Sequence, residues 1–134
     1  LTTLRASIGA VPDSLVSDAR TALELPLPAD PATVKQVVFL GHRWSVGLAH
    51  EAALKLRESA GAWTEAYPVW EYQHELPEIV AADIRSTGAT VYVDDLDPQA
   101  NLVLAHRLAL ALAREADRDP DTPPFLNRSV LTTS

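Results

Sequence analysis

Three charged side chains, Glu51, Lys55 and Glu58, are spaced so that a helix would bring them together. They stand at positions i, i+4 and i+7, which lie on one face of a helix over about 10 Å. On such a face a carboxylate can act as a general base beside a cation that stabilises developing negative charge. The same spacing is typical of a solvent-exposed ion pair of little energetic consequence. The spacing alone leaves both interpretations open.

Histidine is the second residue type here that could take part in catalysis, because its ordinary pKa lies near neutral pH. His74 follows an aromatic tract and could act as a proton shuttle, although a lone loop histidine is often structural or simply exposed. The other histidines have no metal-ligand spacing with one another or with the carboxylates: His42, His50 and His106. His50 and Glu51 are adjacent, which argues against a His-Glu-x-x-His zinc motif on this helix. We expect no metal and no other cofactor.

The composition limits the classes of partner. The chain has 134 residues, which suits one domain, and a formal net charge of −7, which argues against nucleic-acid binding. It has no cysteine, so disulfides, a thiolate nucleophile and cysteine-ligated metals are excluded. No apolar run approaches the roughly 18 residues that a membrane span needs. These features are typical of a cytoplasmic protein that binds neither nucleic acid nor membrane.

Apolar segments that alternate with helical patterns predict the elements that position these residues. Strands are expected over three segments, Gln36–Leu40, Ala62–Tyr67 and Ala89–Val93. Helices are expected over three more, Val46–Ala60, Leu76–Thr87 and Pro98–Glu115. This alternation predicts an α/β fold with a mainly parallel sheet. Because ligands bind beyond the carboxyl ends of such strands, we expect the candidate residues to lie at that edge.

The first 31 residues show packing patterns rather than chemistry. One or two helices are expected over Leu1–Leu25, with a break near Gly9–Pro12, and Pro26–Pro31 forms a linker. The second helix carries an apolar stripe at helical spacing: Leu15, Val16, Ala19, Ala22 and Leu23. Gly41 and the helix that follows could offer backbone N–H groups to a phosphate, but the loop has no Walker pattern.

Four blocks of sequence, taken in order, resemble the sugar isomerase (SIS) domain family. They are Phe39–Gly41, Ala49–Glu58, Thr64–Pro68 and Glu71–His74. The likeness is greatest to the second, C-terminal SIS lobe of the isomerase half of glucosamine-6-phosphate synthase. That pattern runs Phe-Leu-Gly, Glu-Gly-Ala-Leu-Lys-Leu-Lys-Glu, Ala-Glu-Ala-Tyr and Glu-Leu-Lys-His-Gly-Pro. The likeness continues more loosely to Leu126–Val130.

The resemblance implies a three-layer αβα sandwich with a mainly parallel, doubly wound, flavodoxin-like sheet that binds phosphorylated sugars. The family interconverts ketoses and aldoses through an enediol-type intermediate, in some members with amination or deamination at C2. Glu58 matches the proton-abstracting base, and Lys55 matches the lysine one turn earlier that assists the substrate oxygens. His74 matches the ring-opening histidine, which the family donates across a dimer interface, so a homodimer is expected. Glu51 matches an earlier glutamate, a supporting position at the substrate site.

The chain also departs from the family pattern. Arg128 replaces the lysine near the C-terminus that contacts substrate; a guanidinium keeps the charge but cannot transfer a proton as lysine does. His74 is followed by Glu75 instead of Gly-Pro, and the strand expected next is missing. The Ser/Thr-rich phosphate loop of the family's first lobe is also absent from this sequence. These departures favour a general phosphosugar isomerase or deaminase-isomerase over the synthase itself.

The resemblance divides the chain into two parts. Residues 1–31 match a helical link from a first lobe, and residues 32–134 match the second SIS lobe, lacking a strand after residue 74. The expected function is that of a phosphosugar isomerase of aminosugar metabolism, without a cofactor. A non-catalytic module that binds sugar phosphates or mediates dimerisation is the alternative that the missing phosphate loop and Arg128 leave open.

Overall fold

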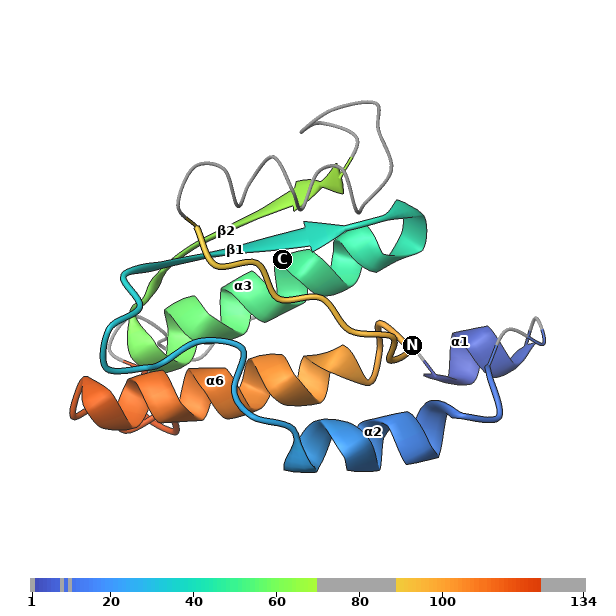
Figure 1. The fold of residues 1–134 in the computed structure, drawn as a ribbon, viewed down its shortest axis with the longest axis horizontal. Coiled ribbons are helices and arrows are strands. Elements are labelled where there is room, and N and C mark those ends of the chain that lie inside the picture. The colour runs from blue at the N-terminus through green and yellow to red at the C-terminus, as the bar shows by residue number, and fades with distance from the viewer. Residues whose placement is uncertain (1, 8, 10, 70–88, 124–134) are drawn as a thin grey trace, which may run out of the picture.

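The computed structural model describes residues 2–7, 9, 11–69 and 89–123, and its centre is a parallel pair of strands joined by a helix (Figure 1). Strand β1, Gln36–Gly41, pairs in parallel with β2, Trp63–Pro68, in a register that runs from Gln36 opposite Trp63 to Gly41 opposite Pro68. The helix between them is α3, Val46–Ala60. The prediction of both strands and of this helix is confirmed, with strand ends shifted by one residue.

Helix α3 begins and ends where local chemistry requires. A short 3-10 turn, η1 (Arg43–Ser45), leads into it, and Gly61 ends it in the left-handed conformation at φ 62°. Glycine favours this conformation because it has no Cβ to clash with the backbone. The amide of Gly61 then donates to the carbonyl of Arg57 at 2.9 Å, which satisfies an otherwise unpaired carbonyl of the last turn.

The core lies where α3 packs against a second long helix, α6, Asn101–Glu115. Figure 1 shows the two helices side by side beneath the strands. Leu56 of α3 and Leu108 of α6 are almost completely buried, and Val37 and Phe39 of β1 pack against the same cluster. Burial of a leucine contributes about 1.5–3 kcal/mol, so this contact holds the helices and strands together. The predicted helix Pro98–Glu115 is confirmed, although it begins three residues later.

Two short helices precede this unit: α1, Thr2–Ser7, and α2, Leu15–Glu24, which packs on α6. Arg107 of α6 donates from Nη1 to the carbonyl oxygens of Ala22 and Leu25, at 2.9 and 2.6 Å, and so satisfies the C-terminal end of α2. The predicted apolar stripe of α2 is only partly buried. Ala22 is fully buried, but Val16 and Leu23 are 64% and 59% exposed, because the contact with α6 covers a narrow strip of α2.

The prediction of a third strand over Ala89–Val93 is wrong. Residues 89–94 form no strand, and Tyr92 and Val93 are 42% and 67% exposed. A β-branched and aromatic tract forms a strand only where a neighbouring strand and a buried face receive it. Among the described residues this segment pairs with no strand, and most of its side chains are exposed. The predicted helix Leu76–Thr87 and the tail Phe125–Ser134 lie outside the described residues.

The architecture is therefore mixed helix and strand with a small parallel two-stranded sheet, compatible with the α/β class. None of the helices in the described part of the chain is long and apolar enough to cross a membrane.

Candidate functional site

Glu51, Lys55 and Glu58 share one face of α3, as their spacing predicts, and we call them the charged face. Lys55 Nζ lies 2.9 Å from Glu58 Oε2 and 3.7 Å from Glu51 Oε1. The side chains of Glu51, Lys55 and Glu58 are 43%, 38% and 24% exposed, so solvent and a ligand can reach all three. The opposite face of α3 anchors the helix through five buried residues: Ala49, Ala52, Ala53, Leu56 and Ala60.

Contacts with β2 hold α3 in place behind the charged face. The buried hydroxyl of Thr64 donates to the carbonyl of Ala53 at 2.8 Å, and Arg57 Nη1 donates to the carbonyl of Thr64 at 3.2 Å. Because both bonds join the helix to the strand, the face is carried by rigid elements and not by a loop.

The electrostatics of the charged face assign different roles to its members. The pKa of the Lys55 ammonium is raised, chiefly by its hydrogen bond to Glu58 and further by the negative charges of Glu58 and Glu51, against a smaller lowering by desolvation. Lys55 is therefore a permanent cation at neutral pH and cannot act as a base. Glu58 uses Oε2 for this bond, and among the described residues its Oε1 accepts none. That oxygen is available to take a proton from a ligand.

The location of the charged face differs from the prediction. Because α3 connects two parallel strands, it runs back along them, and Lys55 and Glu58 lie in its last two turns, before β2 begins at Trp63. These residues thus lie near the amino ends of the strands, at the opposite end of the sheet from Gly41 and Pro68. The expectation that they lie at the carboxyl edge is wrong, because spacing along a helix does not show which end of the sheet each turn approaches.

A hollow of about 230 Å³ adjoins the charged face in the groove between α3 and α6. We call it the α3–α6 hollow. Its lining comes from three segments: Lys55 and Ser59 of α3, His106, Ala109 and Leu110 of α6, and Pro120 and Asp121 beyond α6. Sequence reasoning had set His106 aside and had not singled out Ser59 or Asp121. Ser59 lies one turn after Lys55 on the same helix, so its position follows from helix spacing. His106 and Asp121 reach Lys55 only because α6 packs on α3, so no local motif could have found them.

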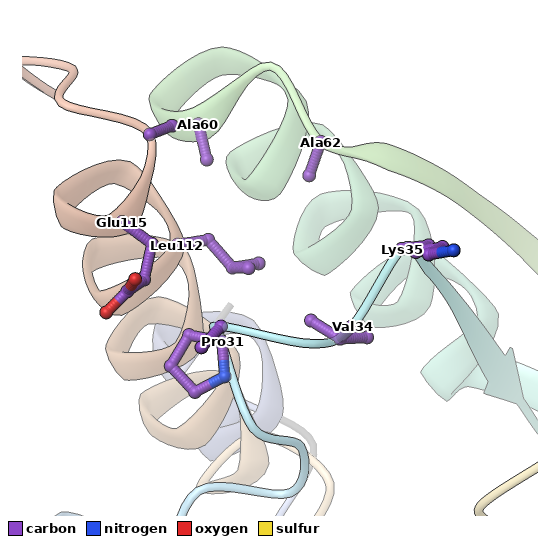
Figure 2. Close-up of a pocket in the computed structure, with 9 residues that line it drawn as sticks. Pro31, Val34, Lys35, Ala60, Ala62, Leu112 and Glu115 are labelled. Carbon is purple, nitrogen blue, oxygen red and sulfur yellow. The ribbon is translucent and has the colours of Figure 1, made fainter.

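A second hollow, of about 300 Å³, lies between the linker before β1 and the ends of α3 and α6 (Figure 2). The sticks in Figure 2 show the apolar side chains of Val34 and Leu112 facing each other across it, while the carboxylate of Glu115 points outward. The side chains that line it are apolar apart from Lys35 and Glu115, so it presents fewer polar side chains than the α3–α6 hollow.

At the carboxyl end of the strands the described residues are packed tightly. A Cβ on Gly41 would lie only 2.6 Å from the Val46 amide nitrogen and 2.7 Å from the Ser45 carbonyl oxygen. Arg43 has a positive φ of 51°, and Ser45 Oγ donates to the His42 carbonyl and accepts from its amide, both at 2.8 Å. The Ser45 hydroxyl therefore makes both of these hydrogen bonds inside the turn.

The packed end is held by an ion pair between α1 and the segment that precedes α6. Arg5 of α1 donates from Nη1 and Nη2 to Asp97 Oδ1 and Oδ2, each at 2.8 Å, and from Nη1 to Gln99 Oε1 at 3.0 Å. Its guanidinium lies 4.6 Å from the ring centroid of Trp44. The hydrogen bonds from Arg5 lower the pKa of Asp97, and backbone bonds add to this against desolvation. The pair is shielded, with side chains 11% and 9% exposed.

Two of the expected site residues, His74 and Arg128, lie outside the described residues. Of the five, the structure brings together Glu51, Lys55 and Glu58. In residues 2–7, 9, 11–69 and 89–123, no three histidine, aspartate or glutamate side chains are arranged to hold a metal ion.

Comparison of the chain with known protein families gives no match, and comparison with curated proteins gives none either. The likeness to the sugar isomerase domain therefore depends on the four sequence blocks.

Proposed function

We propose that this chain is a sugar-phosphate-binding lobe of the SIS type, part of a cytoplasmic phosphosugar isomerase in which Glu58 is the base. The observation that most directly supports this proposal is the Lys55–Glu58 pair. Lys55 Nζ and Glu58 Oε2 lie 2.9 Å apart on an accessible helix face beside a hollow. The proposal includes a three-layer αβα sandwich, in which β1 and β2 would belong to the central sheet and α3 and α6 to one helical layer. It includes no cofactor.

The geometry of the pair suits proton abstraction next to a carbonyl. Glu58 Oε1 takes the proton from C2, the C–H electron pair forms the C1–C2 double bond, and the carbonyl electrons move to oxygen. The fixed positive charge of Lys55 stabilises that oxygen, an electrostatic effect that favours the enediolate over the ground state. The proton of the C2 hydroxyl then passes to the oxygen on C1 through solvent. The C2 carbonyl forms as the electrons of the C1–C2 double bond take the proton of Glu58 at C1, which completes the conversion of aldose to ketose. Amination or deamination at C2 would use the same step.

Three further roles belong to the proposal through the family resemblance. His74, supplied by the second subunit of a homodimer, opens the sugar ring, and Arg128 contributes positive charge at the substrate. Glu51 supports Lys55 from the far side of the charged face, at 3.7 Å.

The proposal is tested by Glu58→Gln, which keeps the shape of the side chain and removes the base. Fructose 6-phosphate and glucosamine 6-phosphate are incubated with the protein in deuterated water, and exchange of the C2 or C1 proton is followed by NMR. General-base catalysis contributes about 10²- to 10⁴-fold, so exchange should fall by that factor. The exposed Glu24 supplies a matched control, since Glu24→Gln removes a carboxylate away from the site. Unchanged exchange in Glu58→Gln would show that Glu58 is not the base.

A second candidate is a binding module without catalysis. Lys55 is engaged by two carboxylates of its own helix, an arrangement that also occurs on inert helix surfaces. Thermal-shift measurements with the same two sugar phosphates separate the candidates. Stabilisation by the ligands without proton exchange in the wild type would favour the binding module.

A further inference from the structure

The α3–α6 hollow has a mixed chemical character that identifies a class of ligand. Its polar groups are the Lys55 ammonium, the Ser59 hydroxyl, the His106 imidazole and the Asp121 carboxylate. An ammonium only donates hydrogen bonds, a carboxylate only accepts them, and a hydroxyl and a neutral imidazole do both. A ligand that satisfies all four must itself both donate and accept.

The rest of the lining is apolar and partly uncovered. Leu110 is 43% exposed although it belongs to the core-forming helix, and Pro120 faces the same hollow. A surface with hydrogen-bonding groups around apolar contacts fits a polyhydroxylated carbon chain, whose hydroxyls donate and accept and whose C–H groups pack on leucine and proline. An inorganic anion would be attracted by the Lys55 ammonium but repelled by the Asp121 carboxylate of the same hollow, so it matches the lining less well than a neutral polyhydroxylated chain.

We propose that the α3–α6 hollow binds the hydroxyl-bearing carbon chain of a sugar, with Ser59, His106 and Asp121 hydrogen bonding to its hydroxyls. This inference rests on the proposed function, because Lys55 belongs both to the hollow and to the charged face. The reacting carbons lie by Glu58, and the rest of the chain extends along α6. The phosphate lies outside the hollow. Its volume of about 230 Å³ is below the range of drug-sized ligand sites, which suits a single sugar.

In this proposal His106 and Asp121 contact the substrate at the hollow and not at the Lys55–Glu58 pair. They select the substrate by its hydroxyls and hold its chain, so they are binding residues and not catalytic ones. Both side chains are exposed, and their substitution leaves the Leu56–Leu108 core intact.

The test uses the full chain and three probes in calorimetric titrations. Sorbitol 6-phosphate is an open-chain polyol phosphate that cannot isomerise, and sorbitol and inorganic phosphate separate its two ends. We expect His106→Phe and Asp121→Asn each to raise the Kd for sorbitol 6-phosphate at least fivefold. Both variants should weaken sorbitol binding by a similar factor and leave phosphate binding unchanged. The exposed His50, on α3 but not at the hollow, supplies the control His50→Phe, which should bind all three probes like the wild type.

Each other outcome has a definite meaning. Wild-type affinity for sorbitol 6-phosphate in both variants, with equal thermal unfolding midpoints, overturns the inference. Weakened binding of inorganic phosphate alone also overturns it, because the hollow would then hold the anion. If Glu58→Gln loses proton exchange while the His106 and Asp121 variants bind normally, the proposed function stands and this inference fails. If no sugar phosphate binds or exchanges, both fail.

Discussion

The two ends of the parallel strand pair are built on different principles. At the carboxyl end, Arg5 and Asp97 are 92 residues apart in the chain and form a bidentate ion pair that is largely shielded from solvent. At the amino end, Lys55 and Glu58 are three residues apart on one helix and remain accessible. An ion pair brought together from distant segments exists only because the fold is closed around it. A pair on a single helix exists independently of that closure and is free to meet a ligand.

In the described residues the accessible charged face does not lie at the carboxyl edge of the sheet, where ligands of parallel sheets usually bind. In the described residues that edge is filled by Trp44, Arg5 and the tight turn at Gly41. The accessible charges and the α3–α6 hollow lie toward the amino ends of the strands. Substitutions at the packed carboxyl end should therefore cause large losses of stability, and substitutions at the accessible amino end should cause small losses.

The largest effect is expected from Gly41→Ala at the packed end. The new Cβ would overlap backbone atoms of Ser45 and Val46, which cannot move without breaking the turn. We expect the free energy of unfolding, measured in urea, to fall by about 3 kcal/mol, which is the upper end of the range for substitutions that overpack a core. Gly47→Ala is the matched control, because its Cβ would meet nothing within 4 Å and alanine favours the helix. A Gly41→Ala protein as stable as the Gly47→Ala protein would contradict the tight packing of this end.

The next effect is expected from Asp97→Asn, which removes the charge that Arg5 binds. The urea midpoint should fall, by less than for Gly41→Ala, because no atoms overlap and the amide can still accept a hydrogen bond. The exposed Asp13 supplies the control Asp13→Asn.

Asp97→Asn should also change how the stability of the protein depends on pH. The folded pKa of Asp97 lies below its ordinary value of 3.8, so the contribution of the pair is complete above about pH 4 and is lost as the pH falls through the folded value. Wild-type stability should therefore decline more steeply than that of Asp97→Asn below pH 4. Parallel declines in unfolding experiments from pH 6 to 2 would show that the pair does not act through ionised Asp97.

At the amino end, Gly61→Ala should cost less than Gly41→Ala. The positive φ of Gly61 costs an alanine about 1 kcal/mol, and its Cβ would approach the guanidinium of Arg118, with Cζ at 2.7 Å. Arg118 is exposed and its flexible end can swing into solvent. A loss measured by urea unfolding that equals the loss for Gly41→Ala would show that both ends are equally rigid.

The smallest effect is expected from Glu51→Gln on the charged face. The ion pair with Lys55 spans 3.7 Å between side chains 43% and 38% exposed, so its contribution to the free energy of unfolding is below about 0.5 kcal/mol. Added salt should remove what remains, because it screens exposed charges. A loss above 1 kcal/mol that persists at about 1 M salt would show that Glu51 has a structural role.

Local patterns predicted local structure well. Helix α3 was predicted residue by residue, because the apolar tract before Gly41 and the stop at Gly61 mark its limits. The shared face of Glu51, Lys55 and Glu58 followed from spacing alone. The strand at Ala89–Val93 could not be judged this way, because a strand depends on a partner elsewhere in the chain. The end of the sheet that Glu58 approaches and the meeting of Lys55 with His106 depend on packing between distant segments.

The two hydrogen bonds from Arg107 to the end of α2 have a consequence for the order of assembly. The carbonyl oxygens of Ala22 and Leu25 are satisfied by a side chain made more than 80 positions later. During synthesis, α2 leaves the ribosome long before this donor exists, so its last turn must stay open or hydrated until α6 emerges. The last turn of α2 is thus completed only after α6 has been made, so this contact forms late in the translation of the chain.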